Sequence, residues 1–174
     1  MQLSVTAVGL DRPGIVAAIS GALGEVGANI EDSSMTVLRG QFAMVLVIAV
    51  DAPAAEVRAA VERGCAPFGL AVHVEPVHDG PPPDGDGGRW TVSVYGADHP
   101  GIVHGVTRRL AGLGINVTDL STRVIEGAPP VYVMLLSVVV PAGVDADAVR
   151  AELDDEAGQL GVECSLHPAD AEIL

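Results

Sequence analysis

Two short segments combine an aspartate, a proline and a glycine where a helix is predicted to begin. Residues 9–16 read Gly-Leu-Asp-Arg-Pro-Gly-Ile-Val, and residues 96–103 read Gly-Ala-Asp-His-Pro-Gly-Ile-Val. The first amides of a helix have no partner inside the helix and carry partial positive charge, so they can bind a carboxylate. A glycine (Gly14 or Gly101) lets a ligand approach this backbone, and the aspartate (Asp11 or Asp98) can accept hydrogen bonds from an ammonium group. The two segments therefore suit a ligand that carries both charges.

An asparagine stands at the same distance beyond each segment. Asn29 lies in Gly-Ala-Asn-Ile and Asn116 in Gly-Ile-Asn-Val. A side-chain amide can donate to a carboxylate and accept from an amine, so these residues suit the same zwitterion, a free amino acid. The alternative is structural: the aspartates would cap helices, proline and glycine would form turns, and the asparagines would take left-handed turn positions.

The chain is a tandem repeat. Shifting the sequence by 87 residues gives 14 identities across positions 5–40 without a gap, and an offset of 92 matches Val57-Arg58-Ala59 with Val149-Arg150-Ala151. We therefore predict a first domain over residues 1–77 and a second over residues 89–174. Residues 78–88 between them are rich in proline, glycine and aspartate, which is typical of a linker.

Hydrophobic periodicity predicts the same elements in both copies. In the first copy, alternation at residues 2–7 predicts a half-buried strand, and Ile15, Ile19 and Leu23 recur at helical spacing. Pro13 is expected at the first helical position and Gly27 just past the helix end. Strands at 29–37, 42–50 and 70–77, with a helix through Val57, Val61 and Phe68, complete the order βαββαβ. This predicts an α+β fold of two ferredoxin-like domains, each a four-stranded antiparallel sheet with two helices on one face.

The third strand, 42–50, is apolar at almost every position, as is its counterpart at 131–140. Such strands are usually covered on both faces, whereas the helices cover only one. We therefore expect a second copy to cover the other face, in a homo-oligomer.

Composition limits the possible partners. The 174 residues are 49% hydrophobic, and 9 basic against 23 acidic residues give a net charge of −14. Such a surface repels a phosphate backbone, so direct nucleic-acid binding is not expected. No apolar run approaches the roughly 20 residues of a membrane span, and no secretory signal is visible. The two cysteines are far apart and are expected to be reduced thiols of a cytoplasmic protein.

The Asp-x-Pro-Gly-Ile-Val segment, followed by Gly-x-Asn-Ile on a βαββαβ frame, resembles the ACT domain, a regulatory module that binds amino acids. Two such domains without a catalytic domain resemble the glycine cleavage system transcriptional repressor family. The resemblance implies a ligand between two ACT domains, where the first loop and helix start of one meet the second strand of its neighbour. Many ACT sites have asparagine where this chain has Asp11 and Asp98, which should favour the ammonium end of a ligand and disfavour acidic amino acids. The ligand-binding residues that the resemblance implies are Asp11, Pro13, Gly14, Asn29, Asp98, Pro100, Gly101 and Asn116. We add Ile30, Val117 and His99 as candidates, with His99 as a contact for the ligand carboxylate.

Other candidates for chemistry are weaker. His99 and His104 are five residues apart, whereas helical metal ligands are three or four apart, so we expect solvated histidines and no metal or cofactor. The acidic residues of 145–156 are interpreted as a solvated face or, alternatively, a docking surface for a basic partner. No catalytic constellation is visible, so an enzyme is not expected. We predict a regulator that senses a small amino acid, glycine or serine, and controls a protein partner such as a transcription activator. The alternatives are a ligand-free assembly module and a regulatory subunit of a biosynthetic enzyme.

Overall fold

The computed structural model describes residues 1–77 and 87–169. The chain divides into two compact units, Met1–Asp79 and Gly80–Leu174, called domain 1 and domain 2 below. Of the predicted linker 78–88, residues 78–86 lie outside the described residues, as do residues 170–174 at the end of the second predicted domain.

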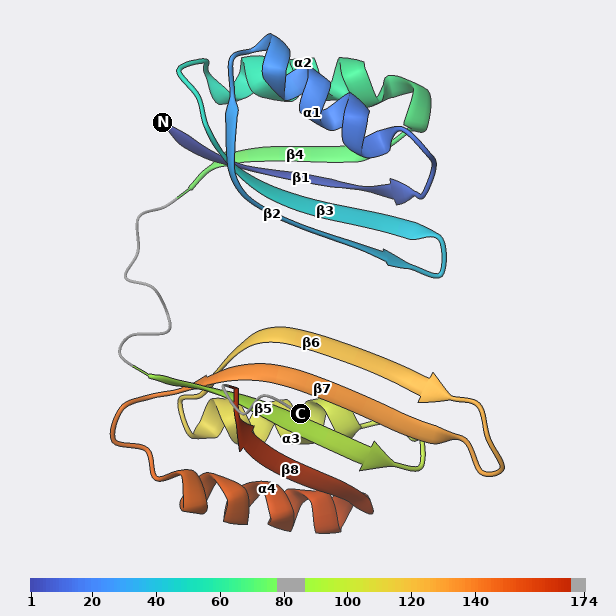
Figure 1. The fold of residues 1–174 in the computed structure, drawn as a ribbon, viewed down its shortest axis with the longest axis vertical. Helices are drawn as coiled ribbons and strands as arrows, with labels where there is room; N and C mark the ends of the chain where they lie inside the picture. The colour runs from blue at the N-terminus through green and yellow to red at the C-terminus, as the bar shows by residue number, and fades with distance from the viewer. Residues whose placement is uncertain (78–86, 170–174) are drawn as a thin grey trace. The chain divides into compact units, whose positions relative to one another are not determined.

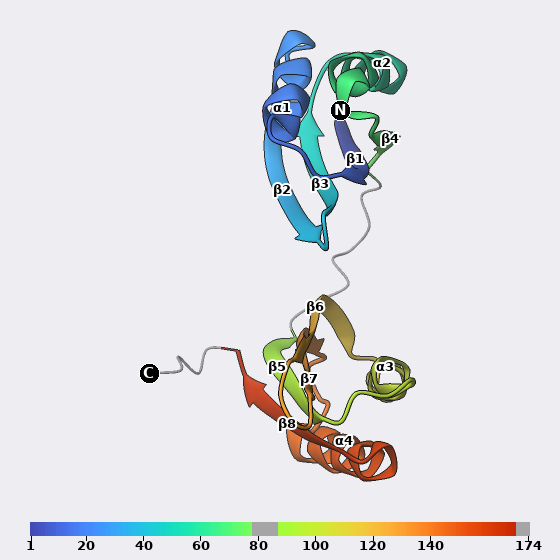
Figure 2. The same cartoon turned by 90° about the vertical axis from the view of Figure 1, so that its right-hand side faces the viewer.

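Domain 1 has the predicted order βαββαβ (Figure 1). Its sheet has the strand order β2-β3-β1-β4, and every neighbouring pair is antiparallel. Both helices cover the same face of this sheet (Figure 2). The elements are β1 (Gln2–Leu10), α1 (Ile15–Glu25), β2 (Asn29–Leu38), β3 (Gln41–Ala49), α2 (Ala54–Cys65), a 3-10 turn (Ala66–Phe68) and β4 (Ala71–Pro76).

Domain 2 repeats this architecture. Its antiparallel sheet has the order β6-β7-β5-β8, the equivalent of the order in domain 1. The elements are β5 (Gly88–Gly96), α3 (Ile102–Gly112), β6 (Asn116–Ile125), β7 (Val131–Val140), α4 (Ala146–Leu160) and β8 (Val162–Pro168). The predicted ferredoxin-like fold is therefore confirmed in both copies.

Each domain has its own hydrophobic core between the sheet and its helices. The repeated Val-Arg-Ala segment explains part of it. Val57 and Val149 are fully buried, and the arginine that follows each valine ties its helix to the outer strand. Arg58 Nη2 donates to Val74 O at 3.0 Å in domain 1, and Arg150 Nε lies 3.5 Å from Leu166 O in domain 2.

The predicted helix start was wrong, whereas the predicted helix end is confirmed. Helix α1 begins at Ile15 with Gly14 as its N-cap, so Pro13 precedes the helix. Gly27 has φ 70°, and its amide donates to Gly24 O while the next amide donates to Leu23 O, which is a Schellman motif. Phe68, predicted to lie in the second helix, lies in the 3-10 turn.

The acidic face predicted for residues 145–156 is only partly solvated. Glu156 is 4% exposed and contacts both Arg108 and Arg109 from α3, so it belongs to the packing between the helices. Asp145 caps the N-terminus of α4 by accepting from the amide of Asp147 at 3.1 Å.

The helix-free face of each sheet is open within its domain. Along β3, buried residues alternate with more exposed ones, and Val45 on the helix-free face is 46% exposed. Strand β2, at the sheet edge, is exposed along its whole length. The apolar face that led us to expect a second copy is therefore present. Within the described ranges, no helix has both the length and the apolar character that crossing a membrane requires.

Candidate functional site

The two Asp-Pro-Gly loops, residues 11–14 and 98–101, join the first strand of each domain to its first helix. Gly14 and Gly101 are the N-caps of α1 and α3, with φ of 99° and 105°, in the left-handed region that favours glycine. Neither helix has a side chain that caps its first amides. The loops therefore leave the positive end of each helix open to a ligand, as the sequence led us to expect.

The aspartates are not helix caps, because the N-cap lies three residues further along the chain. The backbone amide of Asp11 donates to Gly40 O at 2.8 Å, which fixes the loop of domain 1 against the β2–β3 hairpin, while its carboxylate is exposed. In domain 2, burial and then the nearby charge of Asp98 raise the pKa of Tyr132. Both carboxylates remain accessible to an ammonium group.

The asparagines lie at the opposite end of the sheet from the loops. Asn29 and Gln2 both pair with Ala49 on β3, whereas Leu10 and Leu38 at the other strand ends both pair with Gln41. Eight strand residues separate these levels, about 26 Å at 3.3 Å per residue. One domain alone therefore does not bring its asparagine to its Asp-Pro-Gly loop.

Domain 2 separates the two groups in the same way. Asn116 pairs with Val139, which pairs with Arg89 at the start of β5. Ile30 and Val117, which follow the asparagines, pair with buried residues of the central strand; Ile30 is 39% exposed and Val117 is half-buried against the core.

A β-bulge follows each of these residues, because the pairing register shifts between Ile30 and Asp32 and between Val117 and Asp119. Bulges bend the edge strand and turn its side chains locally. The hydrophobic pattern of the sequence did not predict these bulges. The only signal was that the Asn-x-x-Asp spacing is the same in both copies.

His99 is half-buried and hydrogen-bonded, whereas the sequence predicted a solvated side chain. Its Nδ1 lies 3.0 Å from Pro100 O and its Nε2 lies 2.8 Å from Leu160 O at the end of α4. Both ring nitrogens are therefore occupied by the protein. Contact between His99 and a ligand carboxylate stays a prediction and would require the ring to leave these carbonyls.

Two hollows lie in domain 2. One, of about 390 Å³, lies at the end of the sheet and includes Tyr95, Ala97, Pro129, Val162 and Glu163 in its lining. It reaches the residue before Asp98, so it borders the Asp-Pro-Gly loop.

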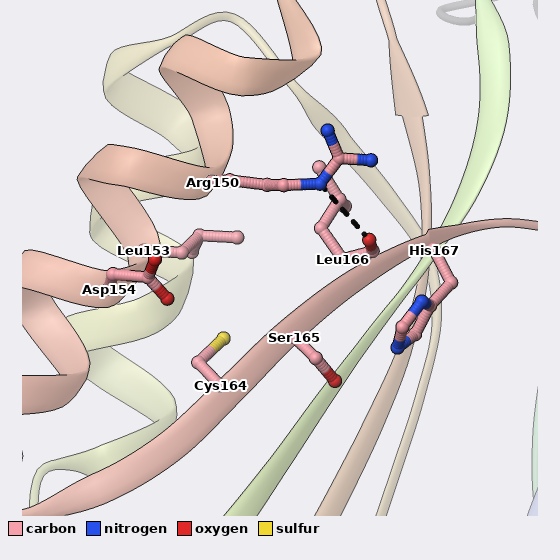
Figure 3. Close-up of a pocket in the computed structure, with 7 residues that line it drawn as sticks. All are labelled: Arg150, Leu153, Asp154, Cys164, Ser165, Leu166 and His167. Atoms are coloured by element: carbon pink, nitrogen blue, oxygen red, sulfur yellow. Dashed lines mark hydrogen bonds between the residues drawn. The ribbon is translucent and has the colours of Figure 1, made fainter.

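The other hollow, of about 200 Å³, lies between α4 and β8 (Figure 3). Arg150 crosses it toward Leu166 O and also lies 5.5 Å from the Trp90 ring, a cation–π distance. Burial raises the pKa of the Cys164 thiol to about 11, so this thiol stays protonated and unreactive near neutral pH. None of its lining residues is among the predicted ligand-binding residues.

Neither cysteine is in a disulfide; Cys65 is buried and Cys164 is half-buried. Among the residues that the structure describes, no three His, Cys, Asp or Glu side chains are grouped as a metal would need.

Both halves of the chain match the same protein family. A family model described as ACT domain matches residues 1–75, and a second one, also described as ACT domain, matches residues 90–158. A UPF0237 protein of Methanopyrus kandleri is 64% identical over 44 residues, which make up 25% of this chain and 49% of that protein. A UPF0237 protein of Pyrobaculum aerophilum is 36% identical over 80 residues, 45% of this chain and 86% of that protein. The chain thus spans about half the length of the first relative and most of the second.

Among the solved structures that match over both domains, two have TM-scores above 0.7. An unknown protein from Galdieria sulphuraria has a TM-score of 0.85 and 28% identity, over 97% of this chain and 98% of that chain. A protein named "putative glycine cleavage system transcriptional repressor" has a TM-score of 0.71 and 24% identity, over 95% of each chain. At that identity, the second match shows a shared fold.

Proposed function

The chain belongs to the ACT-domain family, with two ACT domains in tandem, and from this premise we propose that it is a non-catalytic regulator that binds a small amino acid. Ligand occupancy would be passed to a protein partner. The observation that carries the proposal is the pair of open helix N-termini beside exposed aspartates, repeated in both domains.

The strand register supports a site shared between ACT domains. Strand β2 is an exposed edge strand, and its backbone groups can pair with another strand. Antiparallel pairing of two such edges would place the start of one strand, with Asn29, beside the hairpin end of the other. The Asp11 amide is held at that end by Gly40 O. Such pairing brings together the two groups that lie about 26 Å apart within one domain.

This arrangement uses the exposed sheet edges for association between copies. Homo-oligomerisation is accordingly part of the proposal. A ligand held between two domains favours one arrangement of them over another, which is what transmission of a signal requires.

Charge favours a small neutral amino acid. The helix N-terminus takes the carboxylate, and Asp11 or Asp98 takes the ammonium group. A second carboxylate on the ligand would meet the charge of the aspartate in a chain of net charge −14. We therefore favour glycine or serine over aspartate or glutamate as the ligand.

The partner proposed is a transcription activator of glycine cleavage genes. The support is the fold shared with the named repressor, together with the net charge, which disfavours direct contact with nucleic acid. Regulation of a biosynthetic enzyme is the second candidate for the partner, and co-purification distinguishes the two.

Isothermal titration with glycine and with serine tests the site. The Asn29→Ala/Asn116→Ala double variant should lose at least about tenfold in affinity, the equivalent of roughly 1.4 kcal/mol. The matched control is Ser34→Ala/Ser121→Ala, which changes exposed residues of the same two strands at the same repeat offset and should bind normally. Unchanged affinity in the asparagine variant would contradict the site, and absence of binding in the wild type would favour a ligand-free assembly module.

A further inference from the structure

We propose that His99 is a positioning residue whose protonated side chain holds the Asp-Pro-Gly loop of domain 2 against the end of α4, making this loop sensitive to pH. The inference rests on the proposed function only for what the loop binds. The contact itself belongs to domain 2 alone.

The hydrogen-bond chemistry of the contact requires a charged ring. The Nδ1 and Nε2 atoms of His99 lie 3.0 and 2.8 Å from the carbonyl oxygens of Pro100 and Leu160. Carbonyl oxygens only accept, so each ring nitrogen must donate, and only the imidazolium has two N–H groups. In the neutral ring, one nitrogen lone pair would face a carbonyl oxygen and that contact would be lost.

The place of the contact in the fold favours the positive charge as well. Leu160 is the last residue of α4, where helix carbonyls lack partners within the helix and the helix dipole is negative. The carbonyls of Pro100 and then Leu160 raise the pKa of His99 above its ordinary value, partial burial opposes them, and the charge of Asp98 adds to the rise.

The carboxylates near this contact lie on its own segment, on α4 and on β8. On its own segment Asp98 is the carboxylate that acts on it. On α4, Glu156 is held by Arg109 and is therefore already paired. On β8, Glu163 lines the neighbouring hollow together with Ala97 and Gly161. These two residues belong to the two chain segments that the His99 hydrogen bond joins.

Domain 1 has no histidine at the position equivalent to His99. Arg12 stands at the position of His99, and among the described residues its side chain makes no hydrogen bond or ion pair. Phe68 stands at the position of Leu160 and lies under the loop instead, with its Cζ 3.4 Å from where a Cβ on Gly14 would be. An apolar contact does not titrate, so the loop of domain 1 serves as an internal control.

The direction of the pH effect follows from the raised pKa. The contact should be fully formed below the ordinary histidine pKa of about 6.5 and should be lost as the pH rises through the higher pKa of folded His99. Opening of the loop should then expose the first turn of α3, where the Gly105 amide donates to Gly101 O at 2.8 Å.

Nuclear magnetic resonance of the full chain tests the inference without any ligand. His99 should titrate above the ordinary histidine pKa of about 6.5, with both ring nitrogens protonated in the charged form. The exchange protection of the Gly105 amide, corrected for intrinsic rate, should fall at least about fivefold through that titration. The equivalent amide in domain 1, Ala18, which donates to Gly14 O at 2.9 Å, should stay protected.

Two variants separate positioning from mere packing. His99→Arg retains a cation and should keep the Gly105 amide protected across the whole pH range. His99→Leu keeps the bulk without any N–H donor and should leave that amide poorly protected at every pH. A pKa of His99 at or below the ordinary value of about 6.5, or identical pH profiles for Gly105 and Ala18, would overturn the inference.

The ligand provides a second readout. The dissociation constant for glycine or serine should rise with pH in the wild type and stay constant in His99→Arg. A chain that binds neither amino acid would contradict the proposed function while leaving the exchange result to decide the inference about His99.

Discussion

The two domains have the same fold, but the glycine that lets the two helices approach lies on the second helix in domain 1 and on the first helix in domain 2. In domain 1, α2 contributes Gly64, and a Cβ built there would lie only 3.0 Å from the Cβ of Ala22 on α1. In domain 2, the glycine is on the other helix: Gly105 of α3 faces Glu156 of α4, whose Oε1 would lie 2.6 Å from an added Cβ. Close approach is thus obtained with a glycine on either helix.

What fills the remaining space also differs. Domain 1 uses the small apolar side chains of Ala18 and Ala22. At the equivalent positions domain 2 has Gly105 and Arg109, and the Arg109 Nε donates to Glu156 Oε2 at 2.7 Å. Duplication has preserved the fold and the Asp-Pro-Gly loop, whereas the contact between the helices was free to change in paired positions. Variants that combine residues from the two helix contacts should therefore be less stable than the wild type.

The largest effect is expected from placing the domain 2 glutamate in domain 1. Gly64→Glu inserts a long charged side chain against Ala22 and should reduce the free energy of unfolding by roughly 3 kcal/mol, through overpacking and an unpaired buried charge. Chemical denaturation followed by circular dichroism measures this loss. Adding Ala18→Gly and Ala22→Arg recreates the domain 2 arrangement and should recover at least half of it. A tolerated single variant would show that the packing is not specific.

Removing the acidic partner in domain 2 should come next. Glu156→Gln leaves Arg108 and Arg109 without their shared carboxylate and should cost roughly 2 kcal/mol. The matched control is Glu152→Gln: Glu152 also pairs with Arg109, but its side chain is 46% exposed, so the loss should stay below about 0.5 kcal/mol. Equal losses in the two variants would contradict the importance of burial.

The ion pairs of Glu156 with Arg108 and Arg109 predict that the stability of domain 2 depends on pH. The hydrogen bond from Arg109, followed by the charge of Arg108, lowers the pKa of Glu156 against the opposing effect of burial. This stabilisation should be present above the unfolded glutamate pKa of about 4.3 and be lost as the pH falls through the lower pKa of the folded state. Acid denaturation of Glu156→Gln should therefore be less steep than that of the wild type, and parallel acid transitions would argue against it.

The smallest effects are expected from adding a single methyl group to a glycine of α3. Gly105→Ala should cost about 1 to 2 kcal/mol because its Cβ meets Glu156 and, at 2.9 Å, Leu160 Cδ1. Gly112→Ala, in the same helix with nothing within 4 Å of the added Cβ, should instead stabilise by about 0.5 to 1 kcal/mol. The opposite signs are the prediction, and thermal unfolding of the two variants measures them.

The sequence was sufficient to predict the elements, because each has a local cause. Alternation at Leu3, Val5 and Ala7 predicts the first strand, and all three side chains are buried. The helix start was misread because proline commonly occupies the first helical position, whereas here the left-handed Gly14 is the cap and Pro13 precedes it.

The long-range contacts could not be predicted, because they depend on how elements pack. Glu156 is buried by an arginine 47 residues away, and His99 bonds to a carbonyl 61 residues away. The pairing of Asn29 with Ala49, and so the distance from Asn29 to the Asp-Pro-Gly loop, depends on strand register, which a single sequence does not give. These are the features on which the proposed site and the role of His99 depend.

Thermal unfolding of the purified chain in the presence of each amino acid of a panel shows directly whether the chain binds one of them. A ligand at 100 times its dissociation constant adds about 2.7 kcal/mol, which raises the melting temperature by roughly 5 to 10 °C for a protein of this size. We expect such a shift with glycine or serine and a smaller one or none with aspartate and glutamate. A larger shift with the acidic amino acids, or no shift with any small neutral one, would contradict it.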